Sequence, residues 1–251
     1  MSAPPELPEV ELAGETLAVA DLHLEPDDAP GAEAFAAWTR GLDVGRLMIL
    51  GDLFDAWVGP AHEAAPGARR VIEALAALAG RGVEVDVLQG NRDFLLGESF
   101  ARASRALVRP DGLVARLGSA RLLFLHGDEL CTRDRAYQRL RRLTHSRLVQ
   151  GLGPRLPLFL TRRVAARLRR ASKRAVARKP SEEKAIQHDA VRAQAARHRA
   201  ETLVCGHAHE ARDLALDGGP RFLVLDAFGA GPRDALRLSA GGAVELVASA
   251  P

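Results

Sequence analysis

Short runs of apolar and β-branched residues recur along the chain, and five of them end directly at a polar or Gly-containing loop. They are ETLAVA before Asp21, RLMIL before Gly51, VEVDVL before Gln89, RLLFL before His126 and ETLVC before Gly206. The segments GAEAFAAWTR and PGARRVIEALAALAG lie between them and have apolar residues at helical spacing. Strands that alternate with helices predict an α/β layered fold with buried sheets. After Gly206, short runs with Gly-rich turns predict a final antiparallel meander.

The chain has 251 residues, of which 47% are hydrophobic, enough for one large domain with a real core. We therefore predict a single domain over residues 1–251 that carries an insertion. The start MSAPPELPEVELAGE has no basic or apolar signal region, and no run approaches the ~18 apolar residues of a spanning helix, so we expect a cytoplasmic protein. Cys131 and Cys205 are too few and too far apart for a disulfide framework, so we expect buried thiols.

Charge is distributed very unevenly along the chain. Residues 133–179 contain sixteen Lys and Arg but one acid, Asp134, so this segment carries +15 although the whole chain carries only +3. Its pattern predicts two helices, at about 134–149 and 158–177, interrupted by GLGPRLPLF. Such a basic amphipathic pair can cap an active site, bind an anionic membrane surface, or both. A basic helix packed on the acidic remainder of the chain is the alternative.

The residues that follow the five strand-like runs are typical metal ligands. Carboxyl ends of strands in an α/β sheet share one edge, so loops remote in sequence can converge there. Asp52 is the obvious carboxylate to bridge two cations, with Asn91 supplying a neutral oxygen. The candidate ligands are Asp21 and His23 in ADLHL, Asp52 in LGDLFD, Asn91 in GNRD, His126 in HGDE, and His207 and His209 in GHAH.

Mixed oxygen and imidazole ligands suit Mn, Fe or Zn. Two such ions about 3.5–4 Å apart activate water and stabilise the oxygens of an in-line phosphoryl displacement. We therefore predict phosphoryl displacement assisted by two metal ions. The candidate catalytic residues are Asp52, Asn91, Arg92 and His126. Asp93 is expected to orient its neighbours or to cap a helix from Phe94. The remaining histidines are expected to be ordinary surface residues: His62, His145, His188 and His198.

The motifs DLH, GDLFDAW, GNRD, HGDELC and GHAH, in this order, resemble the calcineurin-like metallophosphoesterases from about residue 17 to 226. Most of that superfamily has a His where this chain has Arg92. The stretches LGDLFDAWVG, GNRDFLLG, HGDELCTRDRAYQ and LPLFLTRRVAARLRRASK are similar to one branch, the UDP-2,3-diacylglucosamine diphosphatases of lipid A biosynthesis. The resemblance implies a four-layer α/β/β/α sandwich of two mixed sheets, with a helical insertion cap at about 134–180.

The resemblance also implies an activity. Such an enzyme uses two Mn²⁺ ions to direct water onto the α-phosphorus of UDP-2,3-diacylglucosamine, and releases UMP and 2,3-diacylglucosamine 1-phosphate (lipid X). The seven candidate ligands would hold the metals. We expect a monomer bound peripherally to the anionic cytoplasmic face of the inner membrane. The substrate contacts would be Asn91, Arg92, Asp134, Ser172, Lys179 and His207, with Tyr137 lining the same pocket.

Arg92 bears on which bond is cleaved. It cannot act as a general acid, but it can hold phosphate oxygens bidentately. A phosphate monoester leaving group needs no acid, whereas an alkoxide would benefit from one, so Arg92 favours pyrophosphate cleavage over protein phosphatase activity. Val176 stands where this branch usually has Asn, Glu210 where Arg is common, and a Trp is absent near Phe228. These departures leave open a paralogue that acts on another nucleotide-linked lipid.

Two further alternatives come from other functional classes. A metallophosphoesterase acting on nucleic acid or cyclic nucleotides would suit the basic segment. However, aromatic residues are only 4% of the chain and the segment holds one Tyr and one Phe, a poor stacking platform, so no nucleic-acid partner is expected. A membrane module with a degenerate metal site is disfavoured because every candidate ligand position holds a competent residue.

Overall fold

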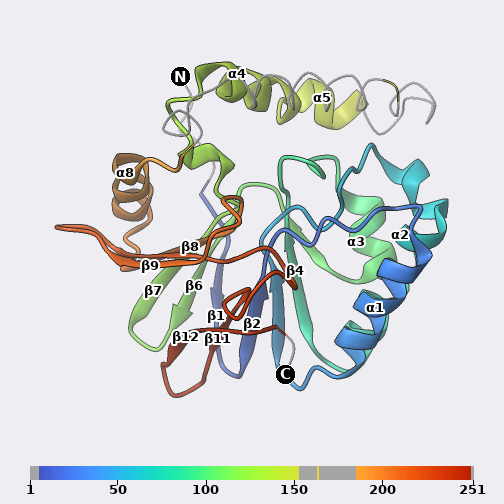
Figure 1. The fold of residues 1–251 in the computed structure, drawn as a ribbon, viewed down its shortest axis with the longest axis horizontal. Coiled ribbons are helices and arrows are strands. Elements are labelled where there is room, and N and C mark those ends of the chain that lie inside the picture. The colour runs from blue at the N-terminus through green and yellow to red at the C-terminus, as the bar shows by residue number, and fades with distance from the viewer. Residues whose placement is uncertain (1–5, 153–162, 164–184, 250–251) are drawn as a thin grey trace.

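Two six-stranded sheets form the centre of the computed structural model, which describes residues 6–152, 163 and 185–249 (Figure 1). The first sheet has the order β1 (Glu9–Glu11), β6 (Leu113–Leu117), β7 (Ala120–Phe124), β8 (Thr202–Cys205), β10 (Arg221–Val224) and β9 (Arg212–Ala215). The second has the order β12 (Val244–Val247), β11 (Ala235–Leu238), β2 (Thr16–Val19), β3 (Arg46–Ile49), β4 (Glu84–Leu88) and β5 (Leu107–Arg109). Both mix parallel and antiparallel pairs.

Helices cover the outer faces of the two sheets and also lie along the top of Figure 1, outside both sheets. They are α1 (Ala29–Arg40), α2 (Pro66–Gly80), α3 (Glu98–Ser104), α4 (Arg135–Thr144), α5 (Arg147–Leu152) and α8 (His188–His198), with short 3-10 helices η1 (Pro60–Ala64) and η2 (Asp128–Leu130). Helix α1 begins where Asp28 accepts a hydrogen bond from the backbone N–H of Gly31 at 3.1 Å, a typical N-cap. Helix α2 begins at Pro66, a residue favoured in the first turn.

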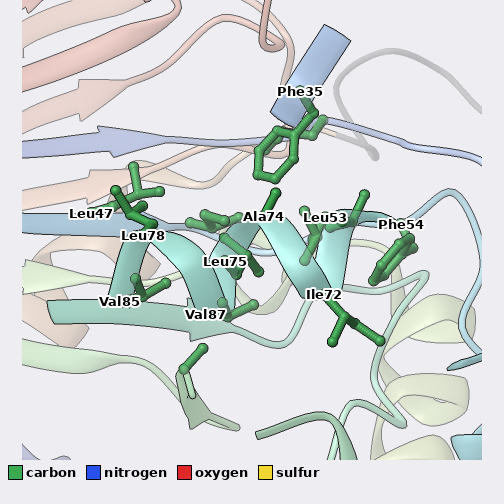
Figure 2. Close-up of a cluster of buried hydrophobic side chains, with 14 of the residues drawn as sticks. Phe35, Leu47, Leu53, Phe54, Ile72, Ala74, Leu75, Leu78, Val85 and Val87 are labelled. Atoms are coloured by element: carbon green, nitrogen blue, oxygen red, sulfur yellow. The ribbon is translucent and has the colours of Figure 1, made fainter. Parts of the chain in front are cut away.

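Three apolar clusters separate the layers. One joins α1 and α2 to β2, β3 and β4; Figure 2 shows Leu75 and Leu78 of α2 beside Leu47, Val85 and Val87 of the strands. A second fills the space between the sheets, and a third joins α8 to the first sheet. The order is therefore helix, sheet, sheet, helix. This confirms the expected α/β fold, a four-layer sandwich of two mixed sheets.

Two details of the predicted fold are wrong. The final strands do not form one meander, because β10 pairs with β8 and β9 in the first sheet whereas β11 pairs with β12 and β2 in the second. The helix expected over 134–149 is two helices, α4 and α5, which His145 and Ser146 separate. The second predicted helix, at 158–177, lies outside the described residues.

Among the described residues, no helix combines the length and the apolar character that crossing a membrane requires. Cys131 and Cys205 are both free thiols and both buried, as expected. Burial raises the pKa of the Cys131 thiol to about 12. His62 corrects an expectation, because it is buried rather than on the surface: its Nδ1 accepts a hydrogen bond from the backbone of Val58 at 3.4 Å, and its ring meets Trp57 edge-on.

Candidate active site

All seven candidate ligands follow the carboxyl ends of strands, in loops contributed by both sheets. In the second sheet β2, β3 and β4 are adjacent and parallel, so the loops that follow them lie side by side. In the first sheet β7 and β8 are also parallel neighbours. The loops after these five strands carry Asp21 and His23, Asp52, Asn91, His126, and His207 and His209.

One side of the site brings together Asp21, His23 and His209, whose ligand atoms lie within 4.8 Å of one another. The Nε2 atoms of the two histidines are 3.1 Å apart, and Nε2 of His209 is 3.3 Å from Oδ1 of Asp21. The other carboxylate oxygen of Asp21 accepts a hydrogen bond from the backbone N–H of His207 at 2.6 Å. Asp21 is thus fixed by the loop after β8 while one of its oxygens faces two imidazoles.

The other side is built around Asp52 and His126, which form a second group with Asp21. Nδ1 of His126 donates to the carbonyl oxygen of Leu50 at 2.9 Å, which turns Nε2 towards Oδ1 of Asn91, 3.0 Å away. Oδ1 of Asp52 is 3.8 Å from Nε2 of His126, and its Oδ2 is 3.8 Å from Nδ1 of His23. One carboxylate therefore faces both sides of the site, the geometry expected of a bridging ligand.

The backbone of the site is unusual. Of the seven non-glycine residues with positive φ in the described part of the chain, five are candidate ligands. The other two, Arg105 and Arg199, end helices α3 and α8, where that conformation is ordinary. Positive φ costs a non-glycine residue about 1–3 kcal/mol and persists where the surroundings impose it, typically at functional sites. The five are Asp21 (55°), His23 (49°), Asp52 (50°), His207 (66°) and His209 (51°).

Glycines let the ligand loops approach one another. A Cβ on Gly90 would overlap the backbone N and Oδ1 of Asp52, and one on Gly206 would overlap Oδ2 of Asp21 and the side chain of Ala20. Any side chain at either position would displace a ligand. The Gly in GNRD and the Gly in GHAH are therefore part of the site, although they hold no ligand atom.

The chemistry of these atoms fits divalent cations. Within the described residues, Oδ1 of Asp21 and Nδ1 of His23 are buried without a hydrogen-bond partner. Burial lowers the pKa of His23 and of His207 to about 4, with help from Arg92 and His126 respectively, so both imidazoles are neutral as ligands must be. Burial alone would lower the pKa of His126, but the neighbouring carboxylates, Asp52 foremost, raise it to about 9. The site therefore attracts positive charge.

Arg92 lies at the edge of this cluster and is partly exposed. Its backbone N–H donates to Oδ1 of Asp52 at 2.9 Å, and its Nε is 3.4 Å from Oδ2 of the same carboxylate. Its terminal nitrogen donates to Asp55 in a short hydrogen bond. Asp55 was not among the predicted site residues, and its place in GDLFD, three residues after Asp52, is the signal that could have identified it. The guanidinium is thus held beside the ligands by two carboxylates.

Asp93 orients its neighbours, as expected, but does not cap a helix. Its carboxylate is fully buried and accepts from the backbone N–H of Gly90 at 2.8 Å and of Phe54 at 3.3 Å. The expected helix from Phe94 is absent, because the next helix is α3, which starts at Glu98. Asp93 therefore ties the loop after β4 to the loop after β3.

The expected substrate contacts lie in two places. Asn91, Arg92 and His207 belong to the ligand loops, whereas Asp134 and Tyr137 lie at the start of α4. Asp134 is buried and caps α4, accepting from the backbone N–H of Tyr137 at 2.9 Å, and the Tyr137 hydroxyl donates to Asp128 in a short hydrogen bond. Asp128 is a further residue that the sequence interpretation missed, although it stands two positions after His126 in HGDE. Ser172 and Lys179 lie outside the described residues, as does Val176.

Comparison with known proteins gives close relatives by sequence. No family model matches the chain. The UDP-2,3-diacylglucosamine hydrolase of Salmonella arizonae is 38% identical over 214 residues, which cover 84% of this chain and 89% of that protein. The protein of the same name from Salmonella agona is 37% identical over the same share of each chain.

Two solved structures match the chain at lower sequence identity. Yfce, a phosphoesterase from E. coli, is 16% identical with a TM-score of 0.45, covering 94% of this chain and 93% of that one. Vps29 from Entamoeba histolytica, complexed with Zn²⁺, is 13% identical with a TM-score of 0.44, covering 92% of this chain and 96% of that one.

Proposed function

Because the chain belongs to the family of UDP-2,3-diacylglucosamine hydrolases, we propose that it cleaves the pyrophosphate of UDP-2,3-diacylglucosamine to UMP and 2,3-diacylglucosamine 1-phosphate in lipid A biosynthesis. The geometry of the candidate active site is the observation that supports this proposal most directly. Loops from both sheets bring carboxylate, imidazole and amide ligands together around Asp52, with the guanidinium of Arg92 beside them. That set suits metal-assisted hydrolysis of a phosphate anhydride.

We propose two Mn²⁺ ions as the cofactors, since mixed oxygen and nitrogen donors suit such ions. Asp21, His23 and His209 would hold one, Asn91, His126 and His207 the other, and Asp52 would bridge them. When bound, the ions would activate water and neutralise charge on the phosphate oxygens.

The chain's own residues would orient the substrate. Arg92 can offer two N–H groups to a phosphate oxygen pair, because its side chain is partly exposed and already fixed by Asp52 and Asp55. The water oxygen forms a bond to the α-phosphorus, and the bond from that phosphorus to the anhydride oxygen breaks. The anhydride oxygen leaves with the lipid phosphate, whose low basicity removes the need for a general acid. Arg92 is thus suited to bind charge rather than to transfer a proton.

The remaining substrate contacts are proposed on both sides of the ligand loops. Asn91, Arg92 and His207 would contact the phosphates, while Asp134, the N-cap of α4, and Tyr137 in its first turn would contact the rest of the substrate. Ser172 and Lys179, which lie outside the described residues, are proposed as further substrate contacts.

We also propose that the basic insertion binds the anionic cytoplasmic face of the inner membrane, supported by the charge of +15 carried by residues 133–179. Reversing Arg162, Arg163, Arg169 and Arg170 to Glu should then weaken binding to anionic vesicles more than it slows turnover of a soluble short-chain analogue. Equal losses in the two assays would indicate a cap without a membrane role.

The test of the function is an Mn²⁺-supplemented assay with UDP-2,3-diacylglucosamine in ¹⁸O-labelled water. The expected products are UMP carrying the label and unlabelled 2,3-diacylglucosamine 1-phosphate. Label in the lipid phosphate would move the attack to the other phosphorus, and UDP as product would show cleavage of the sugar–phosphate bond. Wild-type protein treated with a chelator is the control, and it should be inactive until Mn²⁺ is restored.

A further inference from the structure

The start of the insertion is fixed to two of the ligand loops. Helix α4 follows the loop after β7, which carries His126, and α5 reaches the loop after β4, which carries Arg92. Nε2 of Gln150 in α5 donates to the carbonyl oxygen of Phe94 at 2.8 Å, and the His145 and Phe94 rings lie 6.0 Å apart. Figure 1 shows α4 and α5 together along the top of the view, outside the two sheets.

One buried carboxylate makes the connection at α4. Oδ2 of Asp128 accepts from Nε of Arg141 at 2.9 Å and from the Tyr137 hydroxyl in a short hydrogen bond. The side chain of Asp128 is 2% exposed and that of Arg141 is 20% exposed. Arg141 and Tyr137 are four residues apart on α4, so one carboxylate holds a single face of the helix.

The backbone of the same loop adds to this connection. Nε2 of Gln138 donates to the carbonyl oxygens of Asp128 at 2.9 Å and Cys131 at 3.2 Å. Three side chains of α4, those of Tyr137, Gln138 and Arg141, therefore bind the segment that starts two residues after His126. No step of the proposed reaction uses the Asp128 carboxylate. A buried charge is costly unless it is paired, and Arg141 is its partner.

We infer that Asp128 is a positioning residue: it holds α4, with Tyr137, at a fixed place relative to the His126 loop, and so determines how the enzyme binds the part of the glycolipid beyond its phosphates. This inference rests on the proposed function. Asp128 acts through α4 and not on the reacting phosphorus, so its loss should affect KM rather than kcat.

The test is a double variant, Asp128→Asn with Arg141→Met, which removes both charges of the Asp128–Arg141 pair together. The two single variants complete a double-mutant cycle, and Arg141→Lys tests rescue by a conservative change. Arg139→Met is the matched control, because Arg139 is an exposed arginine of the same helix. KM and kcat for UDP-2,3-diacylglucosamine in mixed micelles, Mn²⁺ affinity by calorimetry and the melting temperature are measured for each.

The double variant should raise KM by about 10- to 100-fold, with kcat within about threefold and Mn²⁺ affinity unchanged, since charged hydrogen bonds and ~1 Å misplacements have effects of this size. The control should match wild type, and the single variants should lose less in combination than the sum of their separate effects. A folded double variant with wild-type KM would overturn the inference, as would parallel losses of kcat and Mn²⁺ affinity, which would place the role of Asp128 at the metal ligands. Wild-type protein that binds Mn²⁺ but leaves the glycolipid intact would instead refute the proposed function, and the inference with it.

Discussion

Replacing Gly90 by Ala should disable the site without changing any ligand. The added methyl would overlap both the backbone N and Oδ1 of Asp52. Neither atom can move freely, because Asp52 already has φ of 50° and its Oδ1 accepts from the backbone N–H of Arg92 at 2.9 Å. The loop after β3 or the end of β4 must therefore shift, and the carboxylate that faces both sides of the site shifts with it.

The size of the effect follows from steric strain and from catalytic geometry. Overpacking of this kind costs about 1–3 kcal/mol of unfolding free energy. For a chain of this length that lowers the melting temperature by roughly 2–12 °C, given about 2–4 °C per kcal/mol. A misplacement of about 1 Å at a catalytic group costs on the order of 100-fold in rate. Activity should thus fall far more than stability.

The assay compares kcat with UDP-2,3-diacylglucosamine, Mn²⁺ affinity and melting temperature for wild type, Gly90→Ala and a control. Gly97→Ala is the control, because it adds the same methyl further along the same loop, where the nearest atom is the carbonyl oxygen of Leu95 at 3.9 Å. The control should retain activity. If Gly90→Ala kept wild-type kcat and Mn²⁺ affinity, the position of the Asp52 carboxylate could not be essential and the bridging role would be refuted.

Two further substitutions and one labelling experiment have defined outcomes. Asp52→Ala removes oxygens that lie 3.8 Å from imidazole nitrogens on both sides of the site, so kcat should fall ~1000-fold or more while circular dichroism shows an intact fold; near-normal turnover would sink the two-cation mechanism. Asp55→Asn removes a carboxylate partner of Arg92 and should lower kcat/KM about 10-fold, with partial recovery in Asp55→Glu; an unchanged value would show that Arg92 needs no such support. Burial raises the pKa of Cys131 to about 12 and also raises that of Cys205, so a thiol reagent at about pH 8 should label neither until the protein unfolds, and rapid labelling of folded protein would contradict their burial.

Local patterns in the sequence were sufficient to predict an α/β layered fold and the candidate ligands, whereas the four-layer arrangement of two mixed sheets was expected from the family resemblance. A strand-like run followed within about three residues by Asp, Asn or His places that residue just beyond the carboxyl end of a strand, and parallel strands align those ends at one edge. Asp52 and His126 could be selected on that ground alone. The break between α4 and α5 could not be predicted from the sequence, because a basic pattern with helical spacing continues through His145 and Ser146.

Only the tertiary structure decided which strands pair with each other and which charged side chains meet. β10 and β11 have similar local patterns, yet they lie in different sheets. Strand pairing depends on how side chains pack against neighbouring strands, which the local pattern does not contain. Asp55 and Asp128 look like ordinary loop acids in the sequence, and they acquire a role only where Arg92 and Arg141 meet them across 37 and 13 positions of the chain. Local propensity determines where strands end and which side chains follow, whereas burial and charge pairing arise from contacts between distant segments, so the sequence identified the candidate ligands and the fold identified what holds them in place.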